Sequence, residues 1–115
     1  MAYTATLGLA LTAAAHEKFK EWSAALPKED RKVVQELLRS ADVHRTKRGA
    51  HLYFWNIVPW DDKSVERRFI EGFVNAMPPA EFHLCRTGDA PWDNEERGAL
   101  ADPFDLRLLR EVTIG

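Results

Sequence analysis

The sequence predicts an α+β protein: a mostly antiparallel sheet of four or five strands with two or three helices on one face. Residues 2–12 alternate strictly between two sets of side chains, which is the period of a strand. Two following segments repeat apolar residues at helical spacing, and residues 42–58 have the pattern of a hairpin. The order strand, one or two helices, hairpin, helix, strand and terminal strand is typical of the split β-α-β, ferredoxin-like arrangement with an additional strand.

Length and composition indicate a single domain, residues 1–115. A chain of 115 residues can bury one core without disulfides or structural metals. The only cysteine is Cys85, which excludes an intramolecular disulfide and suits a reducing cytosol. No apolar run approaches the ~20 residues that span a bilayer, and no basic residue precedes the apolar part of the N-terminal stretch. We therefore expect no signal peptide, no membrane association and a cytoplasmic location.

The net charge of −2 is distributed unevenly along the chain. Residues 1–58 carry +3 and residues 59–115 carry −5. The acids concentrate in residues 86–105, which hold six acidic residues against two arginines. Because a phosphate-binding domain usually has a clear basic excess, this composition argues against a general nucleic-acid role.

The first third of the chain is expected to form a half-buried strand and two helices. The apolar face of the strand carries Tyr3, Ala5, Leu7, Leu9 and Leu11. Thr12 can cap the first helix, whose apolar positions are Ala15, Phe19, Trp22 and Leu26. Pro27 suits the first turn of the second helix, whose stripe is Val34, Leu37, Leu38 and Ala41.

The rest of the chain is expected to complete the sheet. Residues 43–46 and 51–58 are predicted strands joined by a turn at Lys47-Arg48-Gly49, and the second strand is apolar on both faces and therefore interior. A third helix carries Val65, Phe69, Ile70, Phe73, Val74 and Met77 and ends at Pro78-Pro79. Residues 81–87 form the next strand, residues 88–104 a long acidic loop, and residues 105–114 a terminal strand with alternating Leu106, Leu108, Arg110, Val112 and Ile114.

The tetrapeptide Pro59-Trp60-Asp61-Asp62 nearly recurs as Pro91-Trp92-Asp93-Asn94. In the first copy, Asp61 is expected to be the N-cap of the third helix, with Trp60 packed on Val65 as a hydrophobic staple. In the second copy, Asp93 as N-cap would form a capping box with Glu96, but Arg97 cannot complete a staple. Trp92 therefore either folds back over the core or offers an exposed contact.

A basic hairpin tip, residues 44–51, precedes the aromatic run Tyr53-Phe54-Trp55. Its candidate nucleic-acid-binding residues are Arg45, Lys47 and Arg48. Arg48-Gly49 matches the opening of the RNA-recognition motif, in which aromatic residues that stack on bases follow Lys/Arg-Gly. Here Ala50, His51 and Leu52 occupy those positions instead, so a solvated hairpin tip remains the alternative.

Signals for metal binding and catalysis are weak. His83 and Cys85 share one face of a strand without a second pair at zinc-ligand spacing. His44 and His51 could meet only if the hairpin folds favourably. The three serines lie in helical contexts, and the sequence has no nucleophile elbow, phosphate-binding glycine loop or dinucleotide fingerprint. We therefore expect no enzyme, no metal and no cofactor.

A family resemblance spans most of the chain. It is carried by Arg86-Thr87-Gly88-Asp89, by Asp93-Asn94-Glu95-Glu96-Arg97-Gly98 and the final Leu/Arg/Val strand, and by the strands from Tyr3 to Leu11 and from His51 to Trp55. In these segments the chain resembles small uncharacterised proteins of phages and prophages, relative to which Ala90-Pro91-Trp92 lengthen the acidic loop. The resemblance implies no catalytic residue. Small phage proteins of this size are often inhibitors that bind a host defence complex, so it implies an anti-CRISPR-like role.

The leading hypothesis is a non-enzymatic protein-binding module, encoded by a phage or mobile element, that inhibits a bacterial defence complex of the CRISPR type in the host cytoplasm. An acidic surface could occupy a basic nucleic-acid channel of that nucleoprotein complex. The candidate partner-binding residues are Asp89, Trp92, Asp93, Glu95 and Glu96.

Two further hypotheses remain. One is a nucleic-acid-binding, ferredoxin-like module that uses the basic hairpin 44–51, and the other is a small-molecule sensor or enzyme with a pocket between sheet and helices. A sheet with helices on one face leaves the other face open, and that face would support a homodimer unless the second helix or the long loop covers it.

Overall fold

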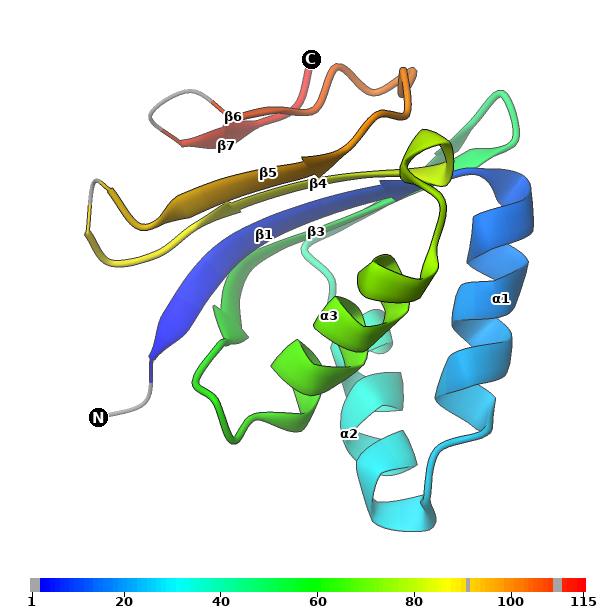
Figure 1. Cartoon of the computed structure of the whole chain (residues 1–115), viewed down its shortest axis with the longest axis vertical. Helices are drawn as coiled ribbons and strands as arrows, with labels where there is room; N and C mark the ends of the chain where they lie inside the picture. Colours follow the sequence, from blue (N-terminus) through cyan, green and yellow to red (C-terminus); the bar gives the residue numbers. More distant parts are fainter. Residues whose placement is uncertain (1–2, 91, 109–110) are drawn as a thin grey trace.

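Five strands form one antiparallel sheet, with three helices on one face and the C-terminal segment on the other (Figure 1). The computed structural model describes residues 3–90, 92–108 and 111–115. In chain order the elements are β1 (Thr4–Leu11), α1 (Ala13–Ala24), α2 (Lys28–Arg39), β2 (Val43–Lys47), β3 (Ala50–Pro59), α3 (Val65–Ala76), η1 (Pro79–Glu81), β4 (Phe82–Thr87), β5 (Asn94–Gly98), β6 (Arg107–Leu108) and β7 (Val112–Thr113). The predicted α+β class is confirmed.

The large sheet has the strand order β2-β3-β1-β4-β5, and every neighbouring pair is antiparallel. The strand β1 is therefore central, and β3 is interior, as its two apolar faces predict. A separate two-stranded sheet pairs β6 with β7. The finer ferredoxin-like assignment stays a prediction.

The helix-facing core forms from the aromatic and aliphatic stripes of all three helices. Phe19 of α1 packs on Phe69 and Phe73 of α3, with ring centroids 5.2 and 4.9 Å apart. Trp55 of β3 is 1% exposed and donates from Nε1 to the carbonyl oxygen of Leu37 at 2.8 Å. That bond satisfies the one polar atom of the indole, so α2 is held to the sheet by both burial and a hydrogen bond.

Local signals place the helix starts, with two differences from the sequence prediction. Thr12 caps α1, since its side chain accepts from the amide of Ala15 at 3.1 Å. Pro27 stands at the N-cap of α2 and not inside its first turn. The N-cap of α3 is Ser64, whose hydroxyl accepts from the Arg67 amide at 3.3 Å. The prediction that Asp61 is this N-cap was therefore wrong.

The staple expected of Trp60 is also wrong, because the residue preceding the true N-cap is Lys63. Trp60 is nevertheless a structural anchor. It is 1% exposed within the helix-facing core, and its backbone amide donates to the carbonyl of Tyr3 at 2.8 Å. Asp61 serves the preceding turn, where its carboxylate accepts from the amide of Lys63 at 3.0 Å.

The C-terminal third differs most from the prediction. The expected loop 88–104 contains a sheet strand, β5, which pairs antiparallel with β4. A capped helix at Asp93 is therefore wrong, because Glu95 and Glu96 alternate across a strand and do not lie in a helical turn. The expected continuous strand 105–114 is replaced by the short strands β6 and β7, outside the large sheet. Its predicted residue Arg110 lies outside the described residues.

The C-terminal segment, of which residues 99–108 and 111–115 are described, covers the second face of the sheet (Figure 1). We call this segment the C-terminal strap. Phe104, Leu106 and Val112 of the strap pack on apolar residues of the sheet: Ala10, Ala50, Leu52 and Cys85. The open sheet face expected to support a homodimer is thus occupied by the chain itself. The middle of β1 is buried on both faces, not half-buried as expected.

Close approach of the strap explains the glycine in the central strand. A Cβ atom added at Gly8 would lie 2.5 Å from Leu106 Cδ1 and 3.2 Å from Val112 Cγ1. Any side chain at this position would therefore have to displace the Leu106 side chain from its place on the sheet. The strand β1 combines large residues on the helix side with Gly8 and Ala10 on the strap side.

The variant Leu106→Ala tests the packing of the strap. Because Leu106 is 3% exposed, we expect the free energy of unfolding to fall by about 2–5 kcal/mol, as measured by urea denaturation. The control Arg107→Ala removes an exposed side chain of the same segment and should change it by less than about 0.5 kcal/mol. Equal urea midpoints for Leu106→Ala and the wild type would contradict this packing.

Candidate functional site

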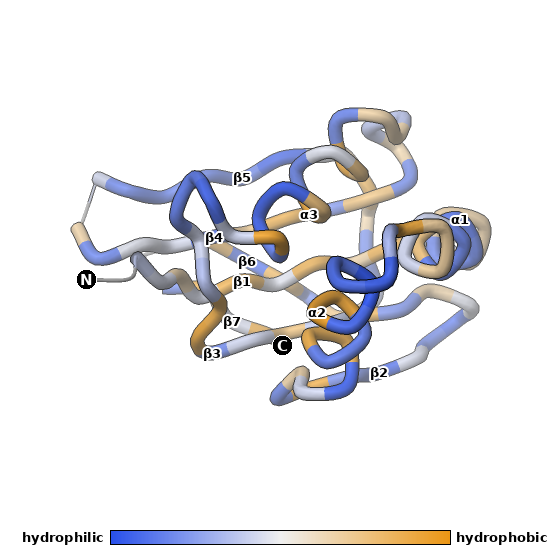
Figure 2. Tube along the Cα trace, turned by 90° about the horizontal axis from the view of Figure 1, so that it is seen from below, coloured by the Kyte–Doolittle hydropathy of each residue, from blue (hydrophilic) through white to orange (hydrophobic). Residues whose placement is uncertain are grey.

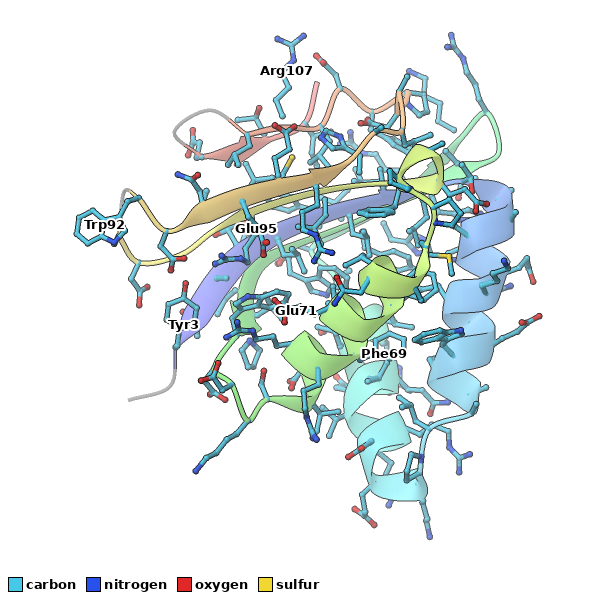
Figure 3. The ribbon with its side chains drawn as sticks, in the orientation of Figure 1. Tyr3, Phe69, Glu71, Trp92, Glu95 and Arg107 are labelled. Carbon is cyan, nitrogen blue, oxygen red and sulfur yellow. The ribbon has the colours of Figure 1, made fainter. Side chains whose placement is uncertain are left out.

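The hairpin of β4 and β5 carries a fully solvated tryptophan at its tip. Trp92 is 83% exposed, and Figure 3 shows its indole at the end of the hairpin, pointing away from the ribbon. Of the two alternatives for this residue, the exposed contact is therefore the one observed. The strand β5 that follows it is hydrophilic, as Figure 2 shows.

A tight turn and an arginine fix the shape of this tip. The amide of Gly88 donates to the carbonyl of Asp93 at 2.6 Å. A Cβ atom on Gly88 would lie 2.0 Å from both the Asp93 carboxylate and the Tyr3 hydroxyl, so only glycine allows this approach. Arg86 is 9% exposed and donates from Nε to Glu95 at 2.8 Å and from Nη1 to Asp93 at 3.2 Å and to the Tyr3 hydroxyl at 3.1 Å.

The pleat of β5 divides the predicted acidic surface between two sides of the sheet. Asp93 and Glu95 point to the helix side and neutralise Arg86. Glu96 points to the strap side and pairs with His83 at 2.6 Å. Asp89 is exposed and forms no ion pair among the described residues. Of the five candidate partner-binding residues, Trp92 and Asp89 are therefore exposed, whereas Asp93, Glu95 and Glu96 form internal ion pairs.

A surface pocket of about 380 Å³ lies beside the hairpin, lined by Tyr3, Trp60, Asp61, Asp62, Arg67, Arg86 and Asp93. The guanidinium groups of Arg67 and Arg86 lie over the Trp60 ring, 5.9 and 5.7 Å from its centroid. The indole Nε1 of Trp60 is buried without a hydrogen-bond partner among the described residues. Acids and arginines neutralise each other here, so the pocket has no single charge to select a ligand.

The basic residues Arg45, Lys47 and Arg48 are exposed on the edge hairpin of β2 and β3. The turn follows the prediction, with Arg48 and Gly49 both at positive φ. The neighbouring aromatics do not form a base-stacking surface, however. Tyr53 and Trp55 are buried under the helices, and Phe54 packs against the strap-side core. The structure therefore separates the basic tip from the aromatic run.

Three histidines converge between α1 and the hairpin. The rings of His16 and His51 stack with centroids 3.6 Å apart and planes 11° apart. The ring of His44 stacks on Tyr53, whose hydroxyl lies 2.8 Å from His16 Nε2. The favourable hairpin geometry that a meeting of His44 and His51 requires is thus present, and His16 joins them from another element.

Burial lowers the pKa of His16 to about 4, assisted by the nearby charges of His51, Lys20 and His44 and opposed by Glu17. Burial also lowers the pKa of His51. Both shifts favour the neutral form of the stacked His16 and His51 rings, because burial penalises a charged ring and a second proton would be repelled by the first.

A second cluster lies under the strap, on the strap-covered face of the sheet. His83 Nδ1 is 2.8 Å from Asp102 Oδ2, and its Nε2 is 2.6 Å from Glu96 Oε2. Cys85 Sγ is 3.5 Å from the same Nε2 and 3.8 Å from Glu96 Oε2. Since ionised carboxylates only accept, these two contacts favour the protonated ring of His83, in which both nitrogens donate.

The charges of this second cluster agree with its hydrogen bonds. Burial alone would lower the pKa of His83, but the hydrogen bonds and charges of Asp102 and Glu96 outweigh it and raise the pKa. Burial, followed by the charge and hydrogen bond of Glu96, raises the pKa of Cys85 to about 12. Cys85, His83 and Asp102 follow one another in contact, as the residues of a nucleophilic triad do. They do not form an active triad, however, since a protonated and buried thiol is a poor nucleophile.

Both clusters bring metal-ligating atoms together, and sequence reasoning missed their composition. In each group, His16-His44-His51 and His83-Cys85-Glu96, the ligand atoms lie within 4.8 Å of one another. The shared face of His83 and Cys85 was visible in the strand alternation. The sequence did not place Glu96 and Asp102 beside these two residues, because the β4–β5 register and the path of the strap are tertiary features.

A comparison with protein-family models, curated proteins and solved structures finds no match to this chain. Among the described residues, no helix has the length and apolar character needed to cross a membrane.

The lowered pKa of His16 predicts a loss of stability in mild acid. Below pH 6.5 the unfolded chain takes up a proton at this residue, whereas the folded protein does so only near pH 4. Between these values the stability contributed by neutral His16 is lost as the pH falls, by up to about 3 kcal/mol. Relative to His16→Gln, the wild type should therefore lose free energy of unfolding from pH 6.5 to pH 4 in urea denaturation.

A control for this measurement is Lys18→Gln, an exposed residue of the same helix. Its stability difference from the wild type should stay constant over the same pH range. A constant difference for His16→Gln as well would show that His16 titrates normally in the folded protein.

Proposed function

We propose that this chain is a non-enzymatic protein-binding module whose contact surface is the tip of the β4–β5 hairpin. The observation that carries the proposal is Trp92, a tryptophan that is 83% exposed between β4 and β5. Tryptophan is among the residues most enriched at the energetic centres of protein interfaces, because it buries a large area with few rotatable bonds.

The contacts at the base of the hairpin turn support this proposal. Arg86 donates hydrogen bonds to Asp93 and Glu95, on either side of the first residue of β5. The Gly88 amide donates to the Asp93 carbonyl across the turn. Fixing the base of a loop reduces the conformational entropy that is lost when a residue of the loop binds. Trp92 can therefore act as an anchor that enters a pocket of a partner.

The charge around the anchor favours a partner with a basic surface. Asp89, three positions before Trp92 in the sequence, is exposed without an internal ion pair in the described part of the chain, and residues 59–115 carry a net charge of −5. Charge complementarity of this kind speeds encounter more than it deepens affinity. A nucleoprotein defence complex of the CRISPR type, with its basic nucleic-acid channel, fits this chemistry, and we propose an inhibitory role there, in the host cytoplasm.

The sequence resemblance to small phage proteins supports the inhibitor assignment, and the side-chain chemistry supports a binding role over catalysis. The cysteine is buried with its thiol protonated. The acids Asp93, Glu95 and Glu96 are paired with Arg86 or His83.

The variant Trp92→Ala tests the anchor. Capture from bacterial lysates identifies the partner, and calorimetry then measures its affinity for wild type and variant. We expect a loss of at least about 2 kcal/mol in binding, as for interface hot spots, with the urea midpoint unchanged because the side chain is exposed.

The matched control is Ile57→Ala, which removes another large apolar side chain, 73% exposed on β3. It should retain wild-type affinity. If Trp92→Ala binds as tightly as the wild type, the hairpin tip is not the contact surface. If the wild type protects no phage against several types of host immunity, the inhibitor assignment fails.

A second candidate function, nucleic-acid binding, is favoured by one observation: Arg45, Lys47 and Arg48 are exposed together on an edge hairpin. Such a patch would bind phosphates without reading bases, because Tyr53 and Trp55 are buried. Binding of this kind depends strongly on salt.

This second function predicts binding of single-stranded RNA or DNA in low salt, measured by fluorescence anisotropy. The triple variant Arg45→Ala, Lys47→Ala, Arg48→Asn should abolish it; asparagine is chosen because residue 48 has a φ of 52°. Charge-neutral changes elsewhere, such as Ile57→Ala, should have no effect. Absence of binding by the wild type at low salt would eliminate this function.

A further inference from the structure

We infer that His83, Cys85 and Glu96 form a binding site for a thiophilic transition-metal ion such as Zn²⁺, with Asp102 as the residue that orients His83. The three ligand atoms meet at the strap side of β4 and β5, with Cys85 Sγ 3.5 Å from His83 Nε2 and 3.8 Å from Glu96 Oε2. This inference does not rest on the proposed function of Trp92.

The distances fit a tetrahedral ion. With Zn–S near 2.3 Å and Zn–N or Zn–O near 2.0–2.2 Å, ligand atoms around Zn²⁺ lie about 3.3–3.7 Å apart. Both sulfur distances are close to this range. The remaining pair, His83 Nε2 and Glu96 Oε2, is 2.6 Å apart, a hydrogen-bond distance that has to open by about 0.7 Å to admit the ion. Glu96 can supply that movement, because its side chain is half exposed.

The residue behind His83 supports a metal site. Metal-ligating histidines usually donate their second ring N–H to a carboxylate, which fixes the ring orientation. Asp102 takes this position at 2.8 Å from Nδ1, and its side chain is only 5% exposed. Its other oxygen accepts from the amides of Phe104 and Leu106 at 2.9 and 3.2 Å, so the carboxylate itself is held in place.

Binding of the ion replaces two protons by one divalent cation. In the ion-free protein one proton lies between His83 Nε2 and Glu96 and another is on the Cys85 thiol. Binding of one Zn²⁺ releases both protons, and the ion takes their two positive charges. Thiolate and imidazole ligands select zinc-like ions over Mg²⁺ and Ca²⁺, which prefer oxygen. Three protein ligands leave the fourth position of the tetrahedron to water.

The other histidine group is a weaker candidate for the same chemistry. His16 and His51 stack face to face at 3.6 Å, and an imidazole lone pair lies in the plane of its ring. The two rings cannot both aim at one ion without turning apart. His16 Nε2 is also engaged by the Tyr53 hydroxyl at 2.8 Å. This group therefore serves as the internal control.

The test is a titration of the full-length, reduced and chelator-treated protein with Co²⁺, followed by competition with Zn²⁺. We expect uptake of one equivalent, with a thiolate-to-Co²⁺ charge-transfer band in the near ultraviolet that Zn²⁺ abolishes. Cys85→Ser should lose the band, and Glu96→Gln should bind more weakly. Glu96→Gln keeps the test valid if Cys85→Ser does not fold, because residue 96 is half exposed.

Further variants distinguish a metal site at His83 from metal uptake elsewhere on the protein. Asp102→Asn should keep the charge-transfer band but bind Co²⁺ about 10–100-fold more weakly, as expected of a positioning residue. His51→Gln and Trp92→Ala should bind as the wild type does. Failure of the wild type to take up Co²⁺ saturably, an unchanged band in Cys85→Ser, or loss of uptake in His51→Gln would each overturn the inference and leave His83 as a purely structural ion-pair partner.

Discussion

Burial of β1 on both faces is the constraint on which the rest of the structure depends. On one side, Leu7, Leu9 and Leu11 pack against the helices. On the other, Gly8 and Ala10 are small enough for Leu106 and Val112 of the strap to pack directly on the sheet. A sheet covered by helices on one face only would leave an apolar surface in water, which is unfavourable in a monomer. The strap removes that cost within one chain.

The strap in turn accounts for the unusual polar cluster at its edge. A segment without long strands needs polar contacts to fix its path, because its own backbone ladder is only two residue pairs long. Asp102 provides them, with one oxygen on the strap amides and the other on His83. The same contacts hold the imidazole beside Cys85 and Glu96. The hydrogen bonds that anchor the strap therefore also position the proposed metal ligands.

The alternation of β5 links the two proposals physically while keeping them separate. Glu95 faces the helices and pairs with Arg86, which shapes the turn that carries Trp92. Glu96 faces the strap and pairs with His83. Successive side chains of a strand point to opposite faces, so one short acidic segment contributes to the proposed binding tip on one side and to the proposed ion site on the other. A metal ion at Glu96 would also stiffen the strand from which the tip projects.

The sequence by itself determined the elements whose signals are local. The strand over residues 4–11, the Thr12 cap and the Arg48-Gly49 turn depend on neighbours within a few residues, and all three are found. The apolar stripes of the three helices pack in the core with one difference: Trp22 of the first stripe is 40% exposed. The α+β class follows from their order. These features were predictable because strand and helix periods and cap geometry are properties of short segments.

Only the tertiary structure decided the rest. Residues 94–98 lack an apolar face, so their strand exists because β4 offers a free edge and Arg86 and His83 offer charge partners. The tryptophans of the repeated tetrapeptide illustrate the same point: Trp60 is buried and Trp92 is solvated, although their local sequences are nearly identical. Their difference, like the meeting of His83 with Asp102, arises from long-range packing, and no short-range pattern in the sequence encodes it.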